Sequence, residues 1–229
     1  MTSTYFLGAN SAQGFYSLYG GFPPRSGFLH IIKGGPGTGK SGFMRAIGSE
    51  AERHGMDVEY VLCSGDPDSL DGVYIPALNE AWVDGTAPHA LDPTIFGVTG
   101  DYVNLGRFCR TPFSSENQVA IRRITPAYKA LYAEGYEHIA AAGKCEVRGG
   151  FDLAPLEKRL DMILRRCPAD GAPYERRVFL RAISCRGLIS LADTLAGYGE
   201  VYEFTSSHGG GAPALELVRR EAERCGLCR

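Results

Sequence analysis

Gly34-Gly35-Pro36-Gly37-Thr38-Gly39-Lys40-Ser41 matches the phosphate-binding pattern GxxxxGK[ST] at every fixed position. An apolar run, Phe28 to Ile32, precedes this loop, and a helix-compatible run, Phe43 to Glu52, follows it. Strand, glycine-rich loop and helix in this order form the context in which the pattern binds phosphate. The sequence therefore predicts a nucleotide phosphate site at this loop.

The residue types of this loop explain what it would bind. Glycines let the backbone turn so that successive N–H groups converge on one anion, while the helix that follows directs its positive end at the same place. Lys40 is expected to reach the β- and γ-phosphates as a catalytic residue, and the Ser41 hydroxyl to hold Mg²⁺. No NKxD sequence occurs, which favours ATP over GTP. The predicted nucleotide-binding residues are Gly35, Pro36, Gly37, Thr38, Gly39, Lys40 and Ser41.

A second strand, Val58 to Leu62, is predicted after the helix, so that Phe28 to Leu62 forms a βαβ unit with a parallel sheet. The loop after this strand then lies beside the phosphates, because ligands gather at the carboxyl ends of such strands. It contains Asp66, Asp68 and Asp71, which could hold Mg²⁺ through water, orient a water or accept a proton, and Asp66 is taken as a catalytic candidate. Asp-Pro and Asp-Gly also form turns without any chemical role.

Another apolar run, Ala81 to Val83, ends in Asp84. An aspartate that closes a buried strand next to a phosphate loop typically contacts the Mg²⁺ water shell, so Asp84 is predicted as a metal and catalytic residue. Gly85 stands where many motor ATPases carry a glutamate that polarises water, so such a group must come from elsewhere. Thr86 and His89 are candidates for sensing the γ-phosphate, although a single histidine in a loop often has no such role.

The predicted fold class is α/β, a P-loop NTPase three-layer α/β/α sandwich with a mainly parallel sheet and an inserted helical segment. Residues 1–229 are expected to form a single P-loop NTPase domain, with the helical insertion at about 114–166. Leu91 to Ser115 is predicted as an irregular connection. Thr125 and Pro126 resemble a cap and first-turn pair of a helix that ends at Gly143, and a second helix covers Leu153 to Leu164.

Self-comparison indicates a degenerate partial second repeat at 178–229. Tyr5 to Leu18 matches Val178 to Leu191 at an offset of 173 residues with seven identities, where chance supplies about one. Glu50-Ala51-Glu52-Arg53 recurs as Glu221-Ala222-Glu223-Arg224. At the offset of 171 residues that this block defines, Lys40 corresponds to Gly211, so the second loop is not expected to bind Mg-nucleotide. The second copy ends one helix after its loop, and strands at Val178 to Ile183 and Val201 to Phe204 are expected to complete the first sheet.

The composition indicates an ordinary globular protein. Hydrophobic residues make up 44% of the 229 residues, and the net charge of -2 argues against nucleic acid as a partner. Without a secretory signal or an apolar run of about 20 residues, we expect a cytoplasmic protein with no membrane association. Seven scattered cysteines favour reduced thiols, and the single CxxC of Cys225 and Cys228 is a weak metal or redox signal.

Four stretches together resemble a family of largely uncharacterised bacterial P-loop ATPases built from two tandem P-loop halves. They are Tyr5 to Asn10, IIKGGPGTGKS, CSGDPDSLDG and VDGTAPH. The resemblance covers most of residues 4–105 and implies ATP as ligand, with Lys40 and Ser41 contacting phosphate and Mg²⁺. Both family halves usually carry an intact phosphate loop, so this chain resembles a shortened relative with a degenerate second loop.

Three functions follow from these observations. The first is Mg²⁺-dependent ATP binding and hydrolysis coupled to a conformational change. The alternatives are a small-molecule or nucleotide kinase, favoured by the aspartate-rich loop and by Gly85, and a non-hydrolysing nucleotide-binding regulatory protein. A small-molecule or protein substrate is left open, as is a homo-oligomer in which an arginine acts in trans. Candidates for that arginine are Arg122, Arg123, Arg176 and Arg177.

Overall fold

The glycine-rich loop connects strand β4 (Phe28–Lys33) to helix α1 (Lys40–Arg53) in a computed structural model of the chain. The structure describes residues 1–87, 91–109, 115–144, 152–166, 176–198, 201–203 and 211–225. Gly55 follows the end of α1 and has a φ of 71°, in the left-handed region, as expected of a glycine that caps the C-terminus of a helix. The strand, loop and helix predicted around the motif are thus confirmed.

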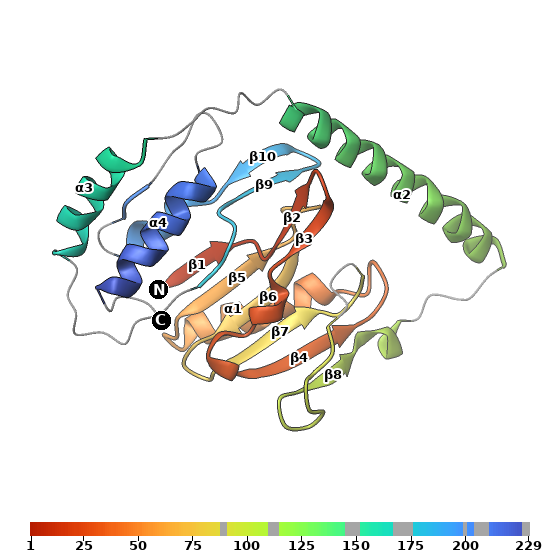
Figure 1. The fold of residues 1–229 in the computed structure, drawn as a ribbon. Helices are drawn as coiled ribbons and strands as arrows, with labels where there is room; N and C mark the ends of the chain where they lie inside the picture. The colour runs from red at the N-terminus through yellow and green to blue at the C-terminus, as the bar shows by residue number, and fades with distance from the viewer. Residues whose placement is uncertain are drawn as a thin grey trace. The chain divides into compact units, whose positions relative to one another are not determined.

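β4 is one strand of a six-stranded sheet (Figure 1). The strands run in the order β1 (Thr2–Tyr5), β5 (Val58–Leu62), β6 (Leu70–Ile75), β7 (Glu80–Asp84), β4 and β8 (Gly100–Asn104). Only β6 runs antiparallel to its neighbours, while the other adjacent pairs are parallel. The chain is therefore α/β, with a mixed sheet of mostly parallel strands flanked by helices.

The βαβ prediction is correct in direction but incomplete in topology. β4 and β5 point the same way on either side of the α1 crossover, yet β6 and β7 lie between them. β7 pairs directly with β4, which places Ile32 opposite Asp84. The loop after β5 turns back into β6, so one part of the predicted aspartate-rich loop is a strand, Leu70–Ile75, with every residue buried.

The two faces of the sheet are both covered. Successive residues of β4 point to opposite faces, and Ile31 and Ile32 accordingly belong to separate apolar clusters. The Ile32 cluster includes Met44 of α1, whereas the Ile31 cluster includes Tyr19 and neighbouring aromatic residues of the N-terminal segment. The short 3₁₀ helices η1 (Tyr19–Gly21) and η2 (Pro24–Ser26) lie in that segment.

Two hairpins outside the sheet have the same local structure. The first joins β2 (Gly8–Ser11) to β3 (Gly14–Ser17), and the second joins β9 (Arg181–Ser184) to β10 (Gly187–Ser190). Every strand boundary is displaced by 173 residues, the offset found in the sequence. The expectation that the segment from Val178 completes the first sheet is wrong, because β9 pairs with β10, and residues 201–203 form no strand.

The hydrogen bonds of the hairpins repeat as well. Ser11 and Ser184 each donate from Oγ to a glycine carbonyl three residues later, over 2.8 Å and 3.1 Å. The N–H of Leu18 donates to Leu7, and that of Leu191 to Leu180, both over 2.7 Å. The hairpins also meet each other: Phe6 and Phe179, which occupy equivalent positions, exchange two backbone hydrogen bonds of 2.9 Å.

The predicted strand from Tyr5 to Asn10 is in fact two strands, because β1 ends at Tyr5 and β2 begins at Gly8. The predicted irregular connection from Leu91 contains β8 and the 3₁₀ helix η3 (Leu105–Phe108). The seven-residue 3₁₀ segment η4 (Ala192–Tyr198) follows β10.

The long helix α2 (Ser115–Lys144) corrects the expected start at Thr125. Pro126 lies inside it, and the Thr125 hydroxyl donates to the Ile121 carbonyl over 2.8 Å. This hydrogen bond is compatible with a helical turn at that point, whereas a capping threonine would bond forward to N–H groups. The helix predicted over Leu153 to Leu164 is confirmed as α3 (Ala154–Leu164).

The chain divides into two compact units, residues 1–140 with 178–199 and residues 141–177 with 200–229. In the second unit α3 packs against α4 (Gly211–Arg224), with Leu160 and Leu217 buried and an Arg220–Glu157 ion pair of 3.3 Å. α4 corresponds to α1 at an offset of 171 residues, with both ends matching. No helix in the described part of the chain is long and apolar enough to cross a membrane.

The packing of α1 on the sheet gives a stability prediction. Met44 is fully buried, so Met44→Ala should lower the free energy of unfolding by about 3 kcal/mol, because it leaves a cavity. The adjacent Phe43 is 37% exposed, and Phe43→Ala should cost about 1 kcal/mol or less. Urea titration measures both. Equal losses for the two variants would contradict this packing.

Candidate functional site

The loop between β4 and α1 depends on its glycines. Gly37 and Gly39 have φ values of 79° and 87°, which side-chain-bearing residues rarely adopt. A Cβ on Gly34 would lie 2.5 Å from Oγ1 of Thr38, whose hydroxyl donates to the Gly35 carbonyl over 2.8 Å. The glycines thus permit the tight bend, and Thr38 closes it from inside.

Backbone donors in this loop lack protein acceptors. The N–H groups of Gly35, Gly37 and Gly39 donate to no group within the described ranges, whereas Thr38 donates to the Gly35 carbonyl over 3.3 Å. Polar backbone groups without a protein partner require water or a ligand. Such donors at a helix N-terminus favour an anion.

Lys40 folds back over the loop instead of extending into solvent. Its Nζ donates to the carbonyls of Gly34 and Gly35 over 2.8 Å and 3.1 Å, and lies 3.5 Å from Oδ2 of Asp84. The side chain is only 9% exposed, and that of Asp84 is 15% exposed. A buried charge needs a paired charge or hydrogen bonds, and this ammonium has both.

Asp84 reaches Lys40 because β7 pairs with β4. It is the last residue of β7, and its Oδ1 accepts hydrogen bonds from both the N–H (2.8 Å) and the hydroxyl of Thr86. These two bonds hold one carboxylate oxygen and direct the other toward the lysine. Thr86 thus orients Asp84, a role that the sequence did not indicate.

Ser41 connects α1 to the start of β6. Its Oγ accepts a hydrogen bond of 2.9 Å from the N–H of Leu70. A hydroxyl oxygen has two lone pairs, so Ser41 keeps one for a further partner. The predicted residues Lys40, Ser41 and Asp84 therefore gather at the carboxyl ends of β4 and β7. Pro36 lies in the loop between β4 and α1.

Close packing against β4 leaves no room for a side chain at Gly85. A Cβ at this position would lie under 3.0 Å from Cγ2 of Ile31 and 3.1 Å from Cδ of Lys33, and the Gly85 carbonyl accepts a hydrogen bond of 3.0 Å from Lys33 Nζ. The backbone therefore approaches β4 too closely for a side chain. A glutamate could occupy this position only if the backbone shifted.

The three aspartates after β5 do not form one cluster. Asp66 is exposed and caps a turn, since its carbonyl accepts from Ser69 over 2.9 Å and its Oδ1 from the Asp68 N–H over 3.3 Å. Asp68 pairs with Arg186. The turn-forming interpretation thus describes Asp66 in this structure, and no hydrogen bond or ion pair among the described residues joins it to the phosphate loop.

Asp71 is the buried member of the three. The register of β6 and β7 pairs Gly72 with Val83, so Asp71 lies beside Asp84 at the same edge. It accepts a hydrogen bond of 3.3 Å from the hydroxyl of Tyr19, whose pKa is raised well above its usual value by burial and then by this carboxylate. Burial of this kind was not visible in the sequence, where Asp71-Gly72 resembles a turn.

Cys63 is half-buried and lies next to Asp71. Burial, and secondly the charge of Asp71, raise the pKa of its thiol to about 12. His89 lies outside the described residues. Among those that are described, no group of three or more His, Cys, Asp or Glu side chains could hold a metal by itself.

Comparison with known proteins adds no relative: no family model, no curated protein and no solved structure matches the chain.

The packing around Gly85 can be tested directly. Gly85→Ala should destabilise the protein by about 1–3 kcal/mol, because the methyl group meets Ile31. Gly42→Ala is the control, since a Cβ there meets nothing within 4 Å and alanine favours the helix. Thermal unfolding of both variants checks this prediction, and an unaltered Gly85→Ala protein would contradict it.

The Cys63 thiol should resist alkylation. Its raised pKa means that the proton is lost only as the pH approaches about 12, so the thiolate fraction at pH 8 is about one in 10,000. Native protein treated with iodoacetamide at pH 8 should carry label on the exposed Cys109 and almost none on Cys63. Peptide mass spectrometry measures this, with the unfolded chain as the fully labelled control. Rapid labelling of native Cys63 would contradict the buried network.

Proposed function

We propose that the chain is a Mg²⁺-dependent ATP-binding P-loop NTPase that hydrolyses ATP, with the three-layer fold of that class. The observation that carries this proposal is the convergence of Lys40 and Asp84, 3.5 Å apart, at the ends of two neighbouring parallel strands. A lysine at the start of a helix, beside unpaired loop N–H groups and a strand-terminal carboxylate, suits a phosphate chain with its metal.

The residues present fit this ligand. Lys40 would exchange its two carbonyl contacts for phosphate oxygens, which are better acceptors for an ammonium because they are charged. Ser41, through its remaining lone pair, and Asp84 would hold Mg²⁺, and the metal would neutralise charge on the phosphates. Thr86 would keep the Asp84 carboxylate oriented while Lys40 moves away from it.

One observation favours a second candidate, transfer of the phosphoryl group to a small molecule. The residue next to Asp84 is Gly85, which packs closely against Ile31, so this position supplies no water-polarising carboxylate. A kinase needs no such group, because its substrate supplies the hydroxyl.

The lysine gives the first test. Lys40→Ala should abolish Mg²⁺-dependent ATP turnover and weaken ATP binding by tenfold or more, because charge-assisted contacts to phosphate are lost. Lys158→Ala, at an exposed lysine of α3, is the matched control and should retain both. Turnover is measured with and without Mg²⁺ at several protein concentrations, and binding by calorimetry.

The outcomes separate the candidates. Turnover that disappears in Lys40→Ala supports hydrolysis. ATP binding without turnover until an alcohol or acid acceptor is added supports the kinase. If neither protein binds ATP, or if Lys40→Ala binds as tightly as the natural chain, the nucleotide site itself is wrong.

A further inference from the structure

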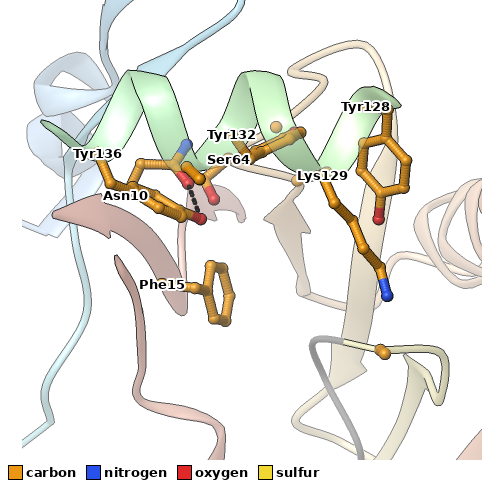
Figure 2. A pocket seen from close by; sticks show the side chains of 11 residues that line it. Asn10, Phe15, Ser64, Tyr128, Lys129, Tyr132 and Tyr136 are labelled. Atoms are coloured by element: carbon orange, nitrogen blue, oxygen red, sulfur yellow. Dashed lines mark hydrogen bonds between the residues drawn. The ribbon is translucent and has the colours of Figure 1, made fainter. Parts of the chain in front are cut away.

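A cavity lies under helix α2, near the carboxyl ends of β5 and β7. Its volume is about 370 Å³, within the range of small-molecule sites. Figure 2 shows the side chains around it. The lining consists of aromatic, small and polar residues: Asn10, Phe15, Cys63, Ser64, Gly65, Ala87, Tyr128, Lys129, Tyr132, Ala133 and Tyr136.

One wall is a row of tyrosines on α2. Tyr128, Tyr132 and Tyr136 recur every four residues and therefore share one face of the helix. Their adjacent ring centroids are 5.7 Å and 6.1 Å apart. The Tyr136 hydroxyl donates to Oδ1 of Asn10 over 3.2 Å, which fixes the end of the row (Figure 2). Phe15 adds a further ring to the lining, so the cavity offers several aromatic surfaces to a planar ligand.

Two polar groups of the lining lack protein partners. Ser64 is 2% exposed, yet its hydroxyl makes no hydrogen bond to any residue that the structure describes. A buried hydroxyl without a partner costs free energy that a bound ligand can recover. The ammonium of Lys129 has no carboxylate partner in the same described ranges, and Figure 2 shows it extending from α2 away from the Asn10–Tyr136 end.

The position of the cavity relates it to the phosphate loop. Ser64 and Gly65 follow β5, and Ala87 lies three residues after Asp84. Both segments are at the edge of the sheet where ligands gather in α/β proteins. β6 and β7 separate β5 from β4, and no lining residue belongs to the phosphate loop, so the cavity is a site distinct from that loop.

We propose that this cavity binds a planar aromatic acid, a carboxylate or phosphate monoester, as a second ligand alongside the nucleotide. Its ring stacks on the tyrosines of α2, a polar substituent bonds the Ser64 hydroxyl, and its acid group pairs with Lys129. The site does not depend on the proposed ATP site, because none of its residues belongs to the phosphate loop.

The test uses 1-naphthyl phosphate, whose ring fluorescence reports binding, with the neutral 1-naphthalenemethanol and inorganic phosphate as partial probes. Natural protein should bind the full probe saturably and each partial probe at least about tenfold more weakly. Lys129→Met should weaken binding about tenfold. Ala133→Trp should abolish it by filling the cavity, and Ser64→Ala should weaken it. Lys144→Met, at another lysine of the same helix, should bind as the natural protein does.

Several results would overturn the proposal: absence of saturable binding at millimolar probe, equal binding by Lys129→Met and the natural chain, or displacement of the probe by ATP. The last result would assign the cavity to the nucleotide's own base. If Ala133→Trp fails to fold, Lys129→Met still decides, because Lys129 is exposed. ATP binding by Lys40→Ala is measured separately, so failure of the nucleotide site is distinguishable from failure of this one.

Discussion

The parallel pairing of β7 with β4 is the constraint on which the candidate site depends. It places Ile32 opposite Asp84, so that the aspartate closing one strand and the loop leaving the other reach the same point. The lysine then satisfies its charge on the Asp84 carboxylate and two loop carbonyls. Without this register Asp84 would not lie 3.5 Å from the Lys40 ammonium, and the buried lysine would lack its paired charge.

The same close approach limits the chemistry. Because Gly85 packs on Ile31 and bonds Lys33, the segment after Asp84 is fixed by β4 on one side. Asp71, on the other side, is buried and bonded to Tyr19. The two carboxylates at this edge therefore differ: Asp84 faces the lysine, while Asp71 belongs to a buried network with Tyr19 and Cys63.

Local sequence patterns correctly predicted the elements whose formation depends on neighbouring residues. The glycine pattern, the apolar run before it and Gly55 located β4, α1 and the end of α1, and Ala81 to Asp84 located β7. Pairing between distant strands is not a local property, so the insertion of β6 beside β5 was missed: Asp71-Gly72 has turn-like composition but is buried by its neighbours. Pro126 was misleading for a different reason: it is typical of a helix start, but a long helix can continue past one missing hydrogen bond. The cavity under α2 could not be predicted from the sequence, because the residues that line it are far apart in the chain.

The contact between Phe6 and Phe179 relates the two hairpins by a local symmetry. Equivalent residues of two copies that bond to each other reciprocally are what a two-fold axis produces, and a self-complementary surface of this kind is the hallmark of a symmetric dimer. The two matching hairpins therefore meet inside one chain as the halves of such a dimer meet across their interface.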